Sequence, residues 1–273
     1  MTARQLVFPT ALALAACATG GPPIYDRPPL YDAAVLDDPV LGRCVWSGRV
    51  SGSWVYQEND HIVAYLEAAN RAEYRQAIPE AFAVPARPLV RVSVIDFYQM
   101  LNGPAYLEVQ IAVLGVYEGE PGWFLLSVPV TDGDACAGGR WAFGYPKVVR
   151  RMTLERSAER YVGTLWAPGG RAPELTLTLD LGEPGGTARD VLRFVYPFPN
   201  LTLKDGRVLK FGGLRQPVDE LERAAPSAWT VRLGRARLEF PRDPESLLHR
   251  LAVGPPLAAY WARLRASYSI TPR

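Results

Sequence analysis

Three consecutive segments decide the fold: YLEVQIAVLGVY (106–117), EGEPG (118–122) and WFLLSVPV (123–130). The outer two segments are rich in β-branched and aromatic residues and partly alternate polar with apolar positions, which is typical of strands. Glycine and proline in the middle segment favour a turn. The sequence therefore predicts a β-hairpin with strands Tyr106–Tyr117 and Trp123–Val130.

Segments of similar composition on both sides of this hairpin predict a sheet-rich domain. The expected strands are 60–65, 89–97, 148–155, 160–166, 174–181, 191–196 and 229–240, and the expected helices are 67–76 and 257–268. Twenty-five prolines and 24 glycines also indicate many short elements separated by turns. Because strands do not alternate regularly with helices, we expect an α+β domain with a large, curved, mainly antiparallel sheet and peripheral helices.

The composition is that of a globular protein without a charged surface for nucleic acid. A chain of 273 residues can form one large domain with a sizeable core. Its net charge is +2, and both signs are interspersed, so no long-range field attracts an anionic polymer. Helix-turn-helix, zinc-finger and phosphate-loop patterns are not found in the sequence. We expect no nucleic-acid partner.

The first 17 residues combine features of a secretory signal with those of a bacterial lipobox. Arg4 supplies one positive charge, residues 6–16 are largely apolar, and LAAC (14–17) ends at Cys17, which would carry the lipid. Residues 18–43 are rich in proline and glycine and indicate a tether to a folded domain at 44–273. On this hypothesis the protein is a periplasmic lipoprotein of the cell envelope, and the lipid is its only membrane contact. The alternative is a disordered N-terminus with a chance cysteine and a cytoplasmic location.

The remaining cysteines and the histidines are few. Cys44 and Cys136 could pair in an oxidising compartment, but the sequence does not place them within bonding distance. His61 and His249 are the two histidines of the chain, so a histidine-based metal site is not expected. We expect both histidines to be structural or solvated.

The segment AGGRWAFGYPKVV (137–149) places Lys147 in a locally apolar and conformationally restricted stretch. Aromatic residues, glycine and proline precede the lysine, and Val148 and Val149 follow it. If the segment packs inward, burial disfavours the charged ammonium, and only the neutral amine attacks a carbonyl group. Lys147 is therefore a candidate nucleophile, and the alternative is a surface lysine after a tight turn.

Three motifs, in the correct order, resemble the acetoacetate decarboxylase family. Gly139-Arg140 with FGYPK (143–147) is similar to the family's Gly-Arg-Glu and Gly-Phe-Pro-Lys-Lys signature, in which the first lysine forms an imine. PAYLEV (104–109) looks like the strand that carries the family's active-site glutamate, here Glu108. IPEAF (78–82) is similar to a Leu-Pro-Glu-Gly-Leu turn. The resemblance extends from about Cys44 to the C-terminus and implies the family's cone-like barrel.

The resemblance implies lysine-based chemistry on a small β-keto acid or other oxo acid, without a metal or organic cofactor. Lys147 would attack the ketone and form a protonated imine, which is an electron sink for cleavage of a carbon–carbon bond, and Glu108 would help to transfer protons. Members of the family often form homo-oligomers, so this chain could do the same. The residues expected to contact the substrate are Arg140, Phe143, Tyr145, Tyr106 and Leu66.

Other interpretations stay open. A relative of the family could use the imine for aldol or dehydration chemistry. Alternatively, the protein could bind a small ligand without turnover through an aromatic loop of Trp141, Phe143 and Tyr145, or dock a partner protein on its surface. Glu108 could be an outward-facing strand carboxylate, and Arg140 could have a structural role.

Two departures from the family pattern affect the substrate. Val148 stands where the signature has its second lysine, so no adjacent ammonium helps to keep Lys147 neutral. Leu66 follows Tyr65 where the decarboxylases have an arginine for the substrate carboxylate. The arginines that could replace it are Arg71, Arg75, Arg87 and Arg91. The sequence therefore supports a lysine-dependent lyase more strongly than it supports acetoacetate as the substrate.

Overall fold

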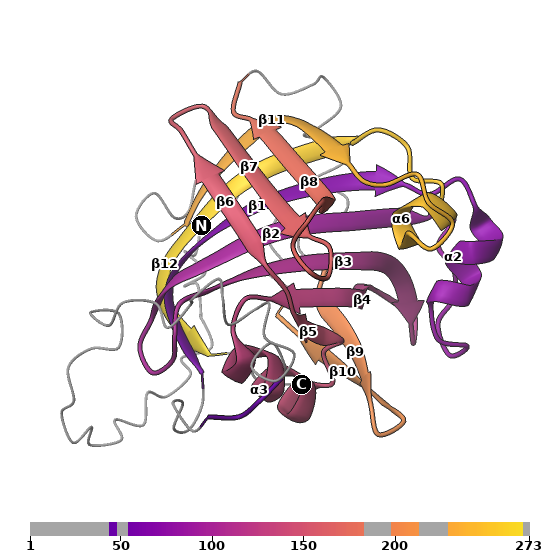
Figure 1. The fold of residues 1–273 in the computed structure, drawn as a ribbon. Helices are drawn as coiled ribbons and strands as arrows, with labels where there is room; N and C mark the ends of the chain where they lie inside the picture. The colour runs from indigo at the N-terminus through magenta and orange to yellow at the C-terminus, as the bar shows by residue number, and fades with distance from the viewer. Residues whose placement is uncertain (1–43, 48–53, 183–197, 213–228, 270–273) are drawn as a thin grey trace, which may run out of the picture.

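The computed structural model describes residues 44–47, 54–182, 198–212 and 229–269, and its centre is one sheet that curls strongly into an open half-barrel (Figure 1). The strands are β1 (Val55–Glu67), β2 (Leu89–Met100), β3 (Tyr106–Tyr117), β4 (Glu120–Val130), β5 (Lys147–Val149), β6 (Met152–Arg156), β7 (Arg160–Trp166), β8 (Pro173–Asp180), β9 (Asn200–Lys204), β10 (Arg207–Phe211), β11 (Trp229–Glu239) and β12 (Ala258–Ser269). The helices are α2 (Arg71–Ala77), α3 (Gly133–Phe143) and α6 (Leu247–Arg250). The predicted α+β class with a large, curved sheet and peripheral helices is confirmed.

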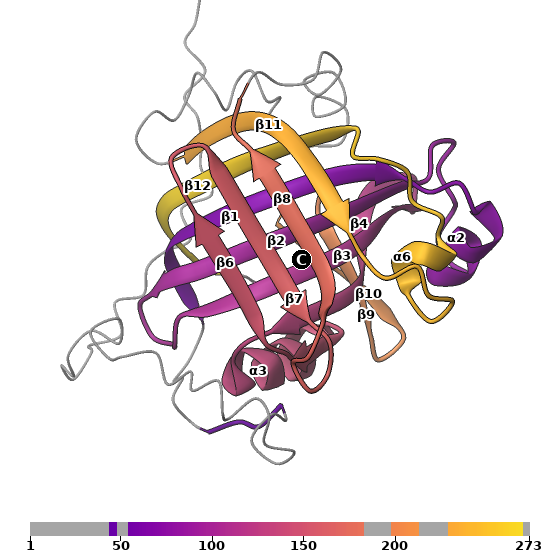
Figure 2. The same cartoon turned by 45° about the horizontal axis from the view of Figure 1, so that its top comes forward.

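The sheet has two faces with different roles. Its strand order is β10-β9-β4-β3-β2-β1-β12-β11-β8-β7-β6, with β5 beside β4, and all pairs are antiparallel except β4–β5 and β4–β9. The sheet folds over, so that β6, β7 and β8 cross one face of β1, β2 and β3 (Figure 2). The largest hydrophobic cluster lies between these layers and includes Ile62, Val92, Val113 and Leu177. We call the opposite face of β1, β2 and β3 the site face; side chains of α3 and β10 pack against it.

The predicted hairpin at residues 106–130 is confirmed, with a tighter turn than expected. Strands β3 and β4 pair up to Tyr117 and Glu120, which leaves a two-residue loop. Glu118 and Gly119 both have positive φ values, 52° and 81°. This is the conformation that two-residue hairpin loops require, because it matches the twist of the flanking strands.

The expected helix at 257–268 is wrong, because β12 occupies this stretch between β1 and β11. Alanine, leucine and arginine give the segment a helix-like composition. However, every residue from Ala258 to Ala262 is buried, with Ala259 and Trp261 in the core between the layers and Tyr260 on the site face. A central strand covered on both faces satisfies this burial, so tertiary packing overrides local propensity.

The remaining differences concern boundaries and two missed strands. The expected strand 148–155 is divided into β5 and β6, and the expected helix 67–76 is the shorter α2, which Asn70 caps by accepting a hydrogen bond from the Glu73 amide. The β9–β10 hairpin was not predicted. The expected strand 191–196, the signal at 1–17 and the tether at 18–43 lie outside the described residues.

Helix α3 was not predicted, although it carries most of the motif before Lys147. Asp132 caps its start by accepting a hydrogen bond from the Ala135 amide. Gly144 caps its end, with a φ of 66° in the left-handed region that favours glycine. A disulfide between Cys136 of this helix and Cys44 joins two segments that are 92 residues apart in the chain. Among the described residues, no helix is long and apolar enough to cross a membrane.

Candidate active site

Lys147 lies at the start of β5, directly after the turn that ends α3. Strand β5 runs parallel to β4, with Lys147 opposite Val128, so the backbone of the lysine is fixed by the sheet. Only 4% of the residue is exposed. Its side chain passes under Gly139 of α3, where a Cβ atom would lie 2.5 Å from Cδ of the lysine. The glycine is therefore what allows the helix and the lysine to approach this closely.

The ammonium group of Lys147 contacts the carboxylate of Glu108 on β3. Nζ lies 2.7 Å from Oε2 of Glu108, and the two side chains are 4% and 3% exposed. Glu108 points to the site face rather than outward to solvent, because even-numbered residues of β3 share that face. Removing one partner of such a buried pair leaves the other charge uncompensated in the interior. Loss of either side chain is therefore expected to destabilise the folded protein.

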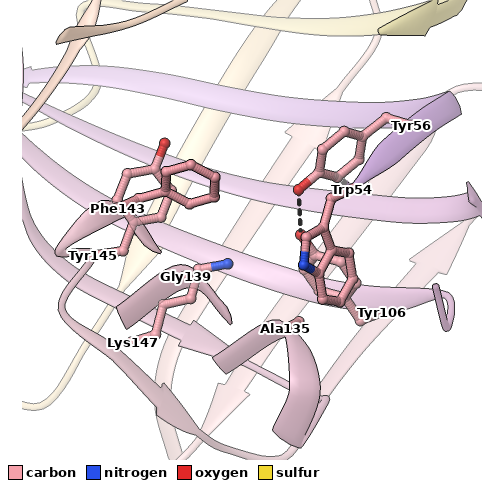
Figure 3. Close-up of a pocket in the computed structure, with 8 residues that line it drawn as sticks. All are labelled: Trp54, Tyr56, Tyr106, Ala135, Gly139, Phe143, Tyr145 and Lys147. Carbon is pink, nitrogen blue, oxygen red and sulfur yellow. Dashed lines mark hydrogen bonds between the residues drawn. The ribbon is translucent and has the colours of Figure 1, made fainter. Parts of the chain in front are cut away.

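A small pocket opens beside the Lys147 amine (Figure 3). Its lining residues are Trp54, Tyr56, Tyr106, Ala135, Gly139, Phe143, Tyr145 and Lys147. The amine lies 5.3 Å from the ring centre of Tyr106 and 5.5 Å from that of Tyr145, close enough for cation–π attraction. The hydroxyls of Tyr56 and Tyr106 are 3.3 Å apart. Burial raises the pKa of Tyr56, so its phenol stays protonated at neutral pH. The pocket therefore offers one buried amine among aromatic walls and phenol groups.

A family model described as acetoacetate decarboxylase (ADC) matches residues 60–270, which include the whole Lys147–Glu108 pair. The chain belongs to the acetoacetate decarboxylase family.

The individual proteins of the acetoacetate decarboxylase family that match this chain are only distantly related to it. Acetoacetate decarboxylase of Burkholderia cenocepacia (strain HI2424) is 32% identical over 104 residues, which are 38% of this chain and 41% of that protein. The match thus spans about two fifths of the curated relative. A solved acetoacetate decarboxylase aligns with a TM-score of 0.61 and 20% identity, covering 83% of this chain and 93% of that one. The enduracididine biosynthesis enzyme MppR, complexed with pyruvate, aligns with a TM-score of 0.55 and 12% identity over 82% and 92% of the two chains. These structures share the fold.

The structure brings some of the expected substrate contacts to the pocket and places others elsewhere. Phe143, Tyr145 and Tyr106 line the pocket. Leu66 is 1% exposed in the core on the opposite face, because neighbouring residues of β1 point to opposite sides and Tyr65 faces the site. Arg140 is exposed, with its guanidinium 3.9 Å from Sγ of Cys44.

The aromatic loop expected in the ligand-binding hypothesis is part of helix α3 and the turn after it. Phe143 and Tyr145 lie at the pocket, whereas Trp141 is 77% exposed. Sequence reasoning missed Trp54 and Tyr56 as pocket residues, because β1 begins earlier than the expected strand at 60–65. Gly139 belonged to the predicted motif, but no role was predicted for it. The Gly138-Gly139 pair inside α3 is the signal that could have indicated a close approach to the helix.

The four arginines that could replace the missing family arginine occupy different places. Arg71 and Arg75 donate hydrogen bonds to backbone carbonyls near the α2 helix, and Arg87 pairs with Glu67 at the surface. Arg91 alone among these four lies on the site face, where its guanidinium stacks 5.3 Å from the ring centre of Trp123. Burial lowers the pKa of Arg91. Among the described residues, no group of three or more His, Cys, Asp and Glu side chains lies together as a metal site requires.

His61 gives the folded protein a predictable dependence on pH. Burial lowers the pKa of this imidazole on β1 to about 4, whereas an unfolded histidine has a pKa near 6.5. Between these two pH values the unfolded chain binds more protons than the folded chain, so the free energy of unfolding rises with pH. The contribution of His61 to that free energy is lost as the pH falls from about 6.5 to about 4. We expect a loss of about 2–3 kcal/mol over this window. Urea denaturation at several pH values should show the slope in the wild type and a smaller slope in His61→Gln. Equal slopes in the two proteins would contradict this assignment.

Proposed function

We propose that this protein is a lyase that forms an imine between Lys147 and the carbonyl carbon of a small β-keto acid or other oxo acid. The observation that carries the proposal is the buried Lys147–Glu108 pair, with 2.7 Å between nitrogen and oxygen, beside an aromatic pocket. Membership of the acetoacetate decarboxylase family supports the same chemistry. A lysine paired only for stability would not need a pocket at its amine.

The pair can move the protons that imine formation requires. Glu108 takes one proton from the Lys147 ammonium, and the nitrogen lone pair then forms the C–N bond while the carbonyl π electrons move to oxygen. Glu108 returns this proton to that oxygen, which becomes a hydroxyl group. It then carries a second proton from the nitrogen to the hydroxyl, which leaves as water, and a protonated imine remains. Loss of carbon dioxide sends the electrons of the broken C–C bond into the imine and gives an enamine. Protonation at carbon and hydrolysis then release the ketone and restore the amine.

Two departures favour an oxo acid other than acetoacetate. Val148 leaves the Lys147 amine without a neighbouring ammonium, and Leu66 offers no guanidinium to a carboxylate in the pocket. Aldol or dehydration chemistry proceeds through the same protonated imine, so both outcomes belong to one proposal. They differ in whether carbon dioxide is released.

Borohydride trapping tests the proposal. The purified protein is incubated with acetoacetate, pyruvate and a panel of other oxo acids, reduced with borohydride and examined by intact mass. We expect a covalent adduct on the wild type and none on Lys147→Ala, because the amine is the nucleophile. Carbon dioxide release from each adduct-forming substrate then separates decarboxylation from aldol chemistry. A wild type that is shown to be folded and gives no adduct with any substrate would refute the proposal.

We also propose that Cys17 is lipidated and that the protein works in the cell envelope. The Cys44–Cys136 disulfide supports this location, because such bonds persist in the bacterial periplasm and are rare in the cytosol. Globomycin, which blocks processing of lipoprotein signals, should cause accumulation of the unprocessed form. Wild-type migration that is unchanged by the drug and by Cys17→Ala would contradict lipidation.

A further inference from the structure

A line of hydrogen bonds runs along the site face from the Lys147–Glu108 pair to Arg91. Lys147 contacts Oε2 of Glu108, and the other carboxylate oxygen, Oε1, accepts a hydrogen bond of 2.6 Å from Nε2 of Gln110. The Gln110 carbonyl oxygen accepts a bond of 2.8 Å from Nη2 of Arg91. The same Nη2 donates to Oδ1 of Asn200 at 2.6 Å. Glu108 and Gln110 are 2% and 6% exposed, so water competes little for these bonds.

The chemistry of the end groups fixes the orientation of the glutamine between them. A guanidinium only donates hydrogen bonds and an ionised carboxylate only accepts them, so Gln110 must turn its oxygen to Arg91 and its amide protons to Glu108. Arg91 is itself held in place by Asn200 on β9 and by the Trp123 ring on β4. The line therefore has one arrangement, and in it Oε1 of Glu108 is occupied.

We propose that Gln110, held by Arg91, is a positioning residue that directs Oε2 alone of Glu108 at Lys147. The inference rests on the proposed function, because it assigns a role in the proton transfers of imine formation. The proton that leaves Nζ of Lys147 goes to Oε2 of Glu108, and the electron pair of the broken N–H bond stays on nitrogen for attack on the carbonyl. The same oxygen then gives this proton to the former carbonyl oxygen and carries the second nitrogen proton to the departing hydroxyl group. With Oε1 engaged by Gln110, these transfers all use one oxygen that already faces the reacting atoms.

Loss of the Gln110 donor frees the second oxygen of Glu108. Gln110→Met keeps the volume and removes the amide donor, so Oε1 can turn toward Lys147 and the carboxylate no longer has one fixed orientation. We expect the maximal rate of imine trapping to fall by roughly 10-fold, while the substrate concentration for half-maximal rate stays nearly unchanged.

The carboxyl carbon NMR shift of Glu108 in the substrate-free protein, measured at one pH, reports on the hydrogen bonds to its carboxylate, with the resonance assigned by its loss in Glu108→Gln. The shift should change in Gln110→Met and in Arg91→Met, and Arg91→Lys should stay close to the wild type. Arg87→Met removes an exposed arginine outside the line and should change neither the shift nor the trapping rate.

The outcomes separate this inference from the proposed function. If Gln110→Met lowers stability but changes neither the Glu108 carboxyl shift nor the trapping rate, Gln110 is only a packing residue and the inference is overturned. A wild type without any adduct refutes the proposed function, and the NMR shift still decides whether Gln110 positions Glu108.

Discussion

Gly139→Ala, a change of one methyl group, is expected to lower the rate of imine trapping by about 100-fold or more while the protein stays folded. The added Cβ would lie 2.5 Å from Cδ, 2.7 Å from Cε and 3.1 Å from Nζ of Lys147, so the lysine side chain must move. Movement of its end breaks the contact with Glu108 and misplaces the nucleophile. The fold tolerates the change because the atoms that yield belong to a flexible side chain, and alanine is favoured over glycine within a helix by about 0.5–1 kcal/mol.

Gly138→Ala is the matched control for this experiment. It adds the same methyl group to the neighbouring position of α3, but there the Cβ would meet the indoles of Trp54 and Trp46 instead of the lysine. We expect this variant to retain most of the trapping rate. The measurement is the initial rate of adduct formation by intact mass, together with circular dichroism to show that each variant is folded. A Gly139→Ala protein that traps substrate at the wild-type rate would show that the position of Lys147 under the helix is unimportant.

Local sequence patterns predicted the parts of the fold that local contacts determine. The hairpin of β3 and β4 carries both its strand composition and its turn residues within 25 consecutive positions (106–130), so it was predicted from that segment alone. The stretch that forms β12 carries a helix-like composition, and only its pairing with β1 and β11 makes it a strand. Such pairings join residues far apart in the chain, which no window of sequence contains.

The candidate site also combines residues that sequence motifs identified with residues whose role depends on the fold. Family motifs marked Lys147 and Glu108, and the structure places their side chains in contact. The motifs did not show that Leu66 faces away from the pocket, because this depends on the alternation of β1 after Tyr65. The line from Glu108 to Arg91 was also not predicted. The side chain of Gln110 gains its role only when β2 brings Arg91 to it, and Asn200 of β9 bonds to that arginine. Strand parity and cross-strand neighbours therefore decide which polar residues reach the site.

Lys147→Met is expected to lower the free energy of unfolding by about 3–5 kcal/mol, although methionine fills nearly the same volume. The substitution leaves the Glu108 carboxylate, which is 2% exposed, in the protein interior without its cation. In the double variant Lys147→Met/Glu108→Gln the buried charge is gone, and a neutral amide remains beside Gln110, so most of the lost stability should return. Urea denaturation of the wild type, both single variants and the double variant forms a complete double-mutant cycle. If the two losses simply add, the amine and the carboxylate do not act as a pair in the folded protein, and the proton transfer proposed for them loses its structural basis.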